Sequence, residues 1–323
     1  MRETHDARTR AVIGRLAPSP TGVLHLGNAR TFLLTWLDVR ARGGTLRMRI
    51  EDIDGPRVRE GAEAAALHDL RWLGLDWDDG ILRQSDHLDV YRSHVADLVA
   101  RGLAYPCVCT RKEVEEAASA PHEEWMDAAP YPGTCRGRFA SVGAARAASG
   151  RDPAIRFRVE VERVPFVDRF RGEEAGRIAG DFVIQKRDGE PAYQCAVVVD
   201  DHRQGVTDVV RGDDLVPSTP RQLLLYAAFG WTPPRFAHLP LLVGADGRRL
   251  AKRHGDTSLA AFRKEGVSAA RMIGYLGALS GLLQPGSECS AAELLASVQR
   301  EGLALERVPR SAVVAVGAEL RGA

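Results

Sequence analysis

The most informative segment of the chain reads Gly14-Arg-Leu-Ala-Pro-Ser-Pro-Thr-Gly-Val-Leu-His-Leu-Gly-Asn28. It joins an apolar run at 11–16, which predicts a buried strand, to apolar positions at helical spacing over 27–42, which predict a helix. A second strand is expected at 45–50 and a second helix at 59–73. This order of elements is typical of a parallel sheet covered by helices, so we expect an α/β fold.

The loop between the first strand and helix has the composition of an anion site. Glycines and small residues at such a turn let backbone N–H groups approach a phosphate, and the helix N-terminus adds a partial positive charge. His25 lies just before the helix and could donate to the same phosphates. A Pro/Gly loop without a ligand is the alternative, but a helix that follows directly favours a nucleotide site.

Composition narrows the classes of protein. The 323 residues carry 44 Lys+Arg and 43 Asp+Glu, a net charge of +1, with 45% hydrophobic residues, which excludes a disordered charged tail. Any nucleic-acid surface must therefore be a local basic patch. No apolar run reaches about 18 residues and the first ten residues are polar, so we expect no membrane partner and a cytoplasmic location.

The strand–helix pattern breaks near residue 105 and returns after 180. We expect residues 11–105 and 181–247 to form the two halves of a Rossmann-like catalytic domain, and 106–180 to be an insertion. In the second half, 192–200 predicts a central strand, Ser218 caps a helix with its hydroxyl, and 236–243 predicts another strand. Residues 248–323 are expected to form a basic loop and a short helical C-terminal region.

Cysteines indicate a metal site. The odd count of five and the absence of an export signal argue against disulfides. Cys107, Cys109 and Cys135 are close in sequence, and three thiolates suit a structural, tetrahedral Zn²⁺. Tyr131 is an unusual ligand that spacing alone does not select as the fourth donor, and His122 is another candidate for that position. Three unrelated buried cysteines are the alternative.

A second segment, Gly247-Arg-Arg-Leu-Ala-Lys-Arg-His254, is a basic loop late in the predicted sheet domain. Such a loop can neutralise phosphate charge in a transition state, although a solvated basic turn is the commoner explanation. Only four lysines occur in the whole chain, which makes Lys252 the candidate.

Two motifs resemble the signatures of class I aminoacyl-tRNA synthetases, His25-Leu-Gly-Asn28 and Arg249-Leu-Ala-Lys-Arg253. Longer strings resemble the glutamyl-tRNA synthetase family and occur in its order: Ala17-Pro-Ser-Pro-Thr-Gly22, Arg49-Ile-Glu-Asp-Ile-Asp54, Val198-Val-Asp-Asp-His202 and Val210-Arg-Gly-Asp-Asp-Leu215. The resemblance covers about residues 12–259. Departures are Asn28 in place of a second histidine, Arg249 in place of a lysine, Ala251 in place of a serine, and Arg253 in place of a neutral polar residue.

The resemblance implies an enzyme that activates glutamate with ATP and Mg²⁺ to glutamyl-adenylate. It assigns the glutamate pocket to Arg15, Ala17, Ser19, Glu51, Tyr193 and Arg211. These residues are expected at the carboxyl ends of parallel strands, where such folds bind ligands. It assigns ATP to His25, Gly27, Asn28 and Lys252, with His25 and Lys252 in catalytic roles. It also makes Tyr131 the fourth zinc ligand.

The cysteine cluster and the length point to a truncated branch of the family, the glutamyl-Q tRNA(Asp) synthetases. Only about seventy residues follow Arg253, too few for the helical anticodon-binding region of a full synthetase. The resemblance implies a monomer that activates glutamate without tRNA and transfers it to queuosine in the anticodon stem-loop of tRNA(Asp). The alternatives are a truncated enzyme charging tRNA(Glu) and an inactive, zinc-containing RNA-binding paralogue.

Overall fold

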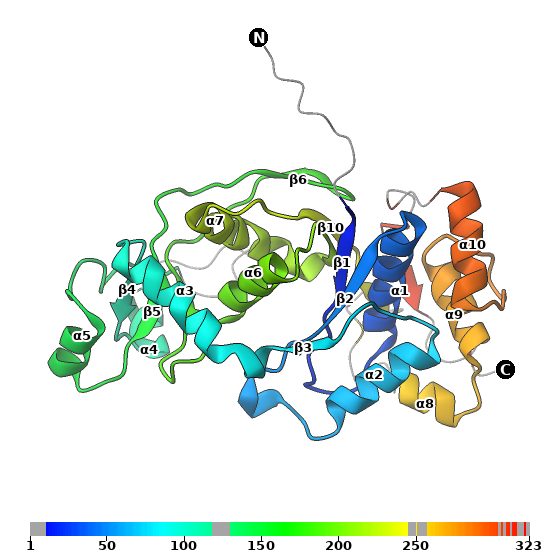
Figure 1. Ribbon diagram of the computed structural model, residues 1–323, viewed down its shortest axis with the longest axis horizontal. Coiled ribbons are helices and arrows are strands. Elements are labelled where there is room, and N and C mark those ends of the chain that lie inside the picture. The colour runs from blue at the N-terminus through cyan, green and yellow to red at the C-terminus, as the bar shows by residue number, and fades with distance from the viewer. Residues whose placement is uncertain are drawn as a thin grey trace, which may run out of the picture.

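The computed structural model describes residues 11–117, 130–244, 250, 257–302, 305, 308–310, 312–314 and 320. Parallel strands and helices form the right-hand part of the molecule in Figure 1, and an antiparallel sheet with two short helices forms its left end. No helix in the described ranges is both long and apolar enough to cross a membrane.

Two parallel sheets form the centre of the α/β part, as the sequence predicted. β1 (Ile13–Leu16), β2 (Thr45–Ile50) and β3 (Ile81–Arg83) pair in that order, and β9 (Asp208–Gly212) pairs with β10 (Arg235–Leu239). The two sheets meet edge to edge, because the backbone N–H of Thr207 donates to the Ile13 carbonyl at 2.8 Å. The ends of β1 and β9 therefore lie side by side.

Helix α1 (Leu26–Ala41) packs closely on these strands. Its Leu33 and Leu37 are fully buried against Leu16, Leu46 and other apolar residues of β1 and β2. Glycine is needed at position 14, since a Cβ there would collide with Val39 of α1. The N-terminus of α1 thus lies directly beyond the end of β1.

Further helices complete the same core. α2 (Ala62–Trp72) follows β2, α9 (Ala269–Leu279) and α10 (Ala291–Glu301) pack beside α1, and α8 (Leu259–Lys264) lies next to α2 (Figure 1). Short 3-10 helices span Gly55–Arg57, Gln84–His87 and Asp213–Ser218. The two helices expected after residue 247, at 269–283 and 291–298, are confirmed as α9 and α10 with shifted ends.

An antiparallel sheet of β4 (Ala104–Cys107), β5 (Ala154–Phe157) and β8 (Phe182–Gln185) lies at the other end, after α3 (Leu88–Ala100). It carries α4 (Arg111–Ala117) and α5 (Val142–Ser149) (Figure 1). A hairpin of β6 (Phe166–Asp168) and β7 (Gly172–Glu174) returns to the parallel sheet, where the Arg169 N–H donates to the Phe236 carbonyl at 2.8 Å. This hairpin brings a distant part of the chain to β10.

The predicted central strand at 192–200 is wrong, because this segment is the helix α6 (Tyr193–Arg203). All residues from Cys195 to Asp201 are buried, since α6 packs against α3, α7 (Thr219–Phe229) and β8. An apolar run of this length fits a buried strand and a buried helix equally well, and tertiary packing decided between them. Tyr193 consequently lies at a helix start rather than at a strand end.

Three smaller expectations also need correction. The strand expected at 236–243 is two strands, β10 and β11 (Leu242–Gly244), interrupted at Pro240, which has no N–H for a ladder. The region after 247 is not only helical, because β12 (Ala312–Val314) pairs in parallel with β11. Ser218 precedes α7 but its hydroxyl makes no cap; it accepts from Gln194 Nε2 at 2.9 Å.

Candidate active site

One cavity of about 1140 Å³ brings the predicted ligand residues together. It opens where the β1–α1 loop, the end of β2, the start of α6 and the end of β9 meet. Every predicted glutamate and ATP residue in the described ranges lines it: Arg15, Ala17, Ser19, His25, Gly27, Asn28, Glu51, Tyr193 and Arg211. The segments that carry these residues are far apart in the sequence, so their convergence is a property of the fold.

One side of the cavity is the N-terminus of α1. His25 is the N-cap residue and is exposed, and its backbone N–H donates to Asn28 Oδ1 at 3.4 Å. A Cβ added to Gly27 would meet no atom within 4 Å. The first turn of the helix is therefore open to the cavity, which is the arrangement that suits a phosphate.

A buried charge cluster lies at the carboxyl ends of β1 and β2. Arg49 is fully buried and donates from Nη1 to Asp201 Oδ1 at 2.7 Å and from Nη2 to Glu51 Oε1 at 3.1 Å. Arg15 Nε lies 3.6 Å from the same Asp201 oxygen. Asp201 thus lies close to both arginines, whereas Glu51 is bonded to Arg49.

Burial raises the pKa of Glu51, and the positive charges of Arg49 and Arg15 oppose that rise. The Glu51 side chain is only 11% exposed, yet it faces the cavity. It is placed to meet a cation that enters there.

Arg211 differs from the other two arginines. It is 4% exposed, and its partners are neutral: Nε donates to His238 Nε2 at 2.9 Å and Nη2 to Thr219 Oγ1 at 2.8 Å. Among the described residues, no carboxylate oxygen lies within 4 Å of its guanidinium nitrogens. Burial lowers the pKa of Arg211, which is the expected sign for a cation removed from water. The site therefore holds a positive charge that an anionic ligand could neutralise.

Tyr193 completes this wall from the first turn of α6. Burial raises the pKa of its hydroxyl, and the negative charge of Glu51 raises it further. The hydroxyl therefore stays protonated at neutral pH and can donate a hydrogen bond into the cavity.

Lys252 and its neighbours 251–256 lie outside the described residues, as does Arg249. The residues that flank them line the cavity: Leu250 on one side, Thr257 and Ser258 on the other. The Leu26 N–H donates to the Thr257 carbonyl at 3.1 Å, and Ser258 forms a bridge with His25. The segment after the second signature is thus tied to the first signature, whereas the Leu250 N–H donates to the Leu242 carbonyl at 3.2 Å.

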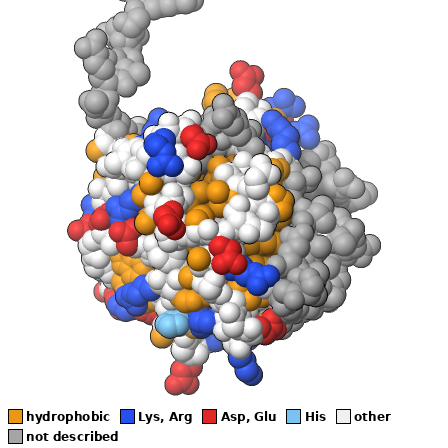
Figure 2. Space-filling model, turned by 90° about the vertical axis from the view of Figure 1, so that its right-hand side faces the viewer, with side chains coloured by type: hydrophobic (Ala, Val, Ile, Leu, Met, Phe, Trp, Pro, Cys, Tyr) orange, Lys and Arg blue, Asp and Glu red, His pale blue; other side chains and the backbone are white. Residues whose placement is uncertain are grey.

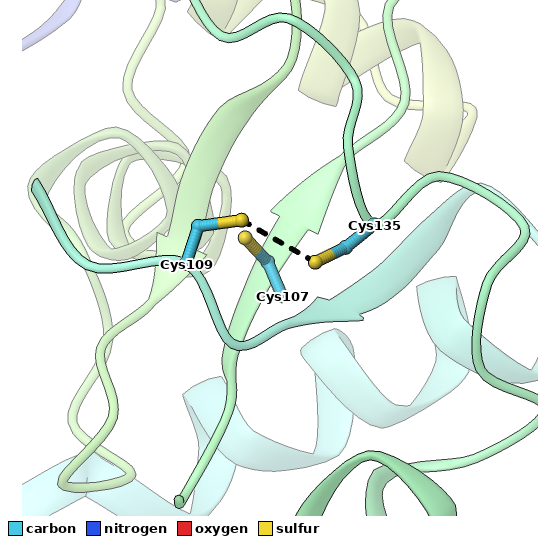
Figure 3. Close-up of side chains that lie close together, drawn as sticks. All are labelled: Cys107, Cys109 and Cys135. Carbon is cyan, nitrogen blue, oxygen red and sulfur yellow. Dashed lines mark hydrogen bonds between the residues drawn. The ribbon is translucent and has the colours of Figure 1, made fainter. Parts of the chain in front are cut away.

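The cysteine cluster lies in the antiparallel sheet, away from this cavity. Cys107 ends β4, Cys109 follows it and Cys135 comes from the loop before α5; Figure 3 shows the three side chains pointing toward one another. Their sulfur atoms lie within 4.8 Å of one another, and tetrahedral zinc would need about 3.8 Å between sulfurs.

Tyr131 fits as a fourth donor in this cluster. Its hydroxyl oxygen is 3.3 Å from Cys107 Sγ and 3.6 Å from Cys109 Sγ. The cluster can bind a metal ion. His122, the other candidate, lies outside the described residues.

Sequence reasoning missed the residues behind the pocket wall. Arg49 and Asp201 belong to quoted family strings, and charged residues within apolar segments were the available signal. His238 stands alone in the apolar run Phe236-Ala-His-Leu239, a weaker signal of the same kind. Nothing in the sequence around Asp168 marks it.

The sequence of residues 11–301 matches the protein-family model for "tRNA synthetases class I (E and Q), catalytic domain". The parallel sheets and the cavity beside the N-terminus of α1 agree with this class. The chain is a ligase with the catalytic domain of a class I tRNA synthetase.

Individual relatives narrow the assignment. The chain is 46% identical to a glutamyl-Q tRNA(Asp) synthetase of Symbiobacterium thermophilum, over 94% of this chain and 98% of that protein. It is 41% identical to glutamate–tRNA ligase 2 of Syntrophus aciditrophicus over 93% of this chain, and covers 63% of that protein. The crystal structure of a glutamate–tRNA synthetase from Elizabethkingia anophelis superposes with a TM-score of 0.79 at 28% identity, covering 97% of this chain and 69% of that one. The chain belongs to the glutamyl-Q tRNA(Asp) synthetase family.

Proposed function

We propose that this enzyme activates L-glutamate with ATP, without any tRNA, and transfers the glutamyl group to queuosine in the anticodon stem-loop of tRNA(Asp). The proposal that the substrate is glutamate rests on Arg211, a buried guanidinium whose hydrogen-bond partners in the protein are neutral. A buried charge without a counter-charge is costly, so a ligand carboxylate is the natural partner. Glu51 on the same cavity supplies the opposite charge that an α-ammonium group needs.

Each pocket residue then has a role. Arg211 and Arg15 bind the side-chain carboxylate of glutamate, Glu51 binds its ammonium group and Tyr193 donates a hydrogen bond. Ala17 and Ser19 form the floor, from the loop after β1. A neutral side chain such as that of glutamine would leave the Arg211 charge unpaired, which gives the site its selectivity.

The phosphates of ATP lie on the open first turn of α1, beside His25, Gly27 and Asn28. The α-carboxylate of glutamate attacks the α-phosphorus, the bond to the β-phosphate oxygen breaks, and pyrophosphate leaves. No enzyme nucleophile takes part, so positioning and charge stabilisation by the helix N-terminus, His25 and Lys252 supply the catalysis. Mg²⁺ bound with ATP would neutralise part of the phosphate charge.

Zinc is the metal that the three thiolates and the tyrosine suit best. We assign it to Cys107, Cys109, Tyr131 and Cys135 in a structural role, because four protein donors leave no open position for a substrate. The cluster then stabilises the insertion at 106–180, between the two halves of the catalytic domain at 11–105 and 181–247, with 248–323 as the C-terminal region.

The RNA surface is proposed beside the metal cluster. A second cavity of about 600 Å³ there is lined by more basic than acidic side chains: Arg111, Arg156, Lys186, Arg187 and Arg221 against Glu115 and Asp181. On the face drawn in Figure 2, the described basic and acidic side chains are instead interspersed. A local basic surface is what a chain of net charge +1 needs to bind RNA.

Pyrophosphate exchange without RNA tests the first half of the proposal. Exchange that depends on glutamate is expected, with aspartate and glutamine as controls that give little. Exchange that requires tRNA(Glu) would favour an ordinary synthetase, and no exchange at all would favour an inactive paralogue.

Transfer of radiolabelled glutamate tests the second half. The three acceptors are tRNA(Asp) with queuosine, the same tRNA with guanosine at that position, and tRNA(Glu). Labelling of the first alone is expected, whereas labelling of tRNA(Glu) contradicts the proposed acceptor. The high coverage of the S. thermophilum relative supports tRNA(Asp).

A further inference from the structure

His238 lies directly behind the proposed glutamate-binding arginine. In the parallel pair of β9 and β10, His238 is the register partner of Arg211, so both side chains stand on the same face of the sheet. His238 is fully buried. The Arg211 guanidinium also lies over the Phe236 ring, 4.9 Å from its centroid. Two residues of β10, Phe236 and His238, therefore contact the arginine.

A continuous chain of hydrogen bonds runs from Asp168 through His238 to Arg211. His238 Nδ1 lies 2.6 Å from Asp168 Oδ2, and His238 Nε2 accepts from Arg211 Nε at 2.9 Å. An arginine nitrogen can only donate, so Nε2 carries the lone pair and Nδ1 carries the proton. The histidine is the neutral Nδ1–H tautomer, and Asp168 fixes it.

Asp168 is itself held rigidly at the end of β6. Its Oδ1 accepts from the backbone N–H groups of Phe170 and Arg171, each at 2.9 Å. Burial alone would raise the pKa of Asp168, but the bonds from His238 and these N–H groups outweigh burial and lower it. Burial lowers the pKa of His238, and the Arg211 charge lowers it further against the opposing effect of Asp168. An ionised Asp168 beside a neutral His238 follows at neutral pH.

We propose that His238, held by Asp168, is a positioning residue that fixes the Arg211 guanidinium for the side-chain carboxylate of the amino acid. This inference rests on the proposed function. A neutral acceptor orients the guanidinium without neutralising it, whereas a carboxylate at position 238 would compete with the substrate for the same charge. Asp168 supplies negative charge one residue further away, where it sets the tautomer and leaves the Arg211 face free.

His238→Leu and His238→Gln separate positioning from packing. Leucine has no acceptor for the Arg211 Nε–H group, whereas the Oε1 atom of glutamine can accept that hydrogen bond in place of His238 Nε2. In glutamate-dependent pyrophosphate exchange, we expect His238→Leu to raise KM for glutamate about 10- to 100-fold, the scale of one hydrogen bond to a charged group. KM for ATP should stay within about twofold. His238→Gln should restore most of the glutamate affinity, and preference for glutamate over glutamine should fall only in the leucine variant.

Thr207→Val is the matched control, because it removes a buried hydroxyl at the other end of β9 that bonds to Asp208 at 2.8 Å. It should lower the melting temperature and leave KM for glutamate unchanged. If His238→Leu does not fold, His238→Met replaces it, since methionine also lacks the nitrogen acceptor for Arg211 Nε and its flexible side chain adapts to the space in a packed core.

The inference is overturned if folded His238→Leu, or folded His238→Met in its place, keeps the wild-type KM for glutamate. It is also overturned if the variant raises KM for glutamate and ATP equally, or if His238→Gln is as impaired as His238→Leu. These failures differ from failure of the proposed function, in which the wild-type enzyme itself shows no glutamate-dependent exchange.

Discussion

Substituting Gly27 by alanine should strengthen the fold and weaken ATP binding together. Gly27 lies in the first turn of α1 and lines the cavity, and a Cβ there would meet no protein atom within 4 Å. Alanine exceeds glycine in helix propensity by up to about 1 kcal/mol, so the melting temperature should rise by roughly 2 °C or less. The added methyl group occupies the space proposed for the phosphates. Crowding of that size costs about 1–3 kcal/mol, which predicts ATP binding about five- to 150-fold weaker.

The assay is KM for ATP in pyrophosphate exchange at saturating glutamate, alongside thermal unfolding. Gly80→Ala is the matched control, since a Cβ at this exposed glycine also meets no atom within 4 Å, but Gly80 does not line the cavity. Its KM for ATP should equal that of the wild type. An unchanged KM for ATP in Gly27→Ala would refute phosphate binding at this helix end. A lower melting temperature of Gly27→Ala would contradict the finding that the space beside Gly27 is open.

Three other perturbations test different parts of the site. Glu51→Gln should raise KM for glutamate roughly tenfold at neutral pH, because it removes the charged partner of the ammonium group. Burial raises the pKa of Glu51 in the wild type, so kcat/KM for glutamate should fall as the pH drops through that pKa. The variant should lack this decline. Lys252→Ala should slow adenylate formation about 100-fold or more, and an unchanged single-turnover rate would contradict its role. Cys107→Ser or chelation should weaken transfer to RNA more than adenylation, and equal losses in the two assays would mean that the cluster supports the whole fold.

Local patterns in the sequence were sufficient for the elements that surround the β1–α1 loop. β2 was predicted with its observed ends, and α1 within one residue at each end, since their apolar periodicity and the glycines at 43 and 44 are local signals. The cysteine cluster was equally accessible, because its spacing implies its chemistry. The order of the family strings then predicted which residues would converge on the cavity.

Long-range packing explains what could not be predicted. The Cys-Ala-Val-Val-Val run of α6 is β-branched and apolar, and only its burial against α3, α7 and β8 makes it a helix. Asp168 and His238 are 70 residues apart, and their bond exists because the β6–β7 hairpin packs onto β10. A histidine in an apolar strand signals a buried polar partner, but it does not say which residue that partner is.

Asp168 also joins the β6–β7 hairpin to the parallel sheet, because its carboxylate bonds to His238 of β10. Its hairpin falls within the proposed insertion at 106–180, as does the cysteine cluster, yet its carboxylate bonds to His238 behind the proposed glutamate pocket. The residues proposed for ATP, His25, Gly27 and Asn28, lie instead in the β1–α1 loop and the first turn of α1. Any effect of metal loss on adenylation should therefore appear in KM for glutamate and leave KM for ATP unchanged. A rise in KM for ATP alone after chelation would show that the insertion acts on the cavity by another route.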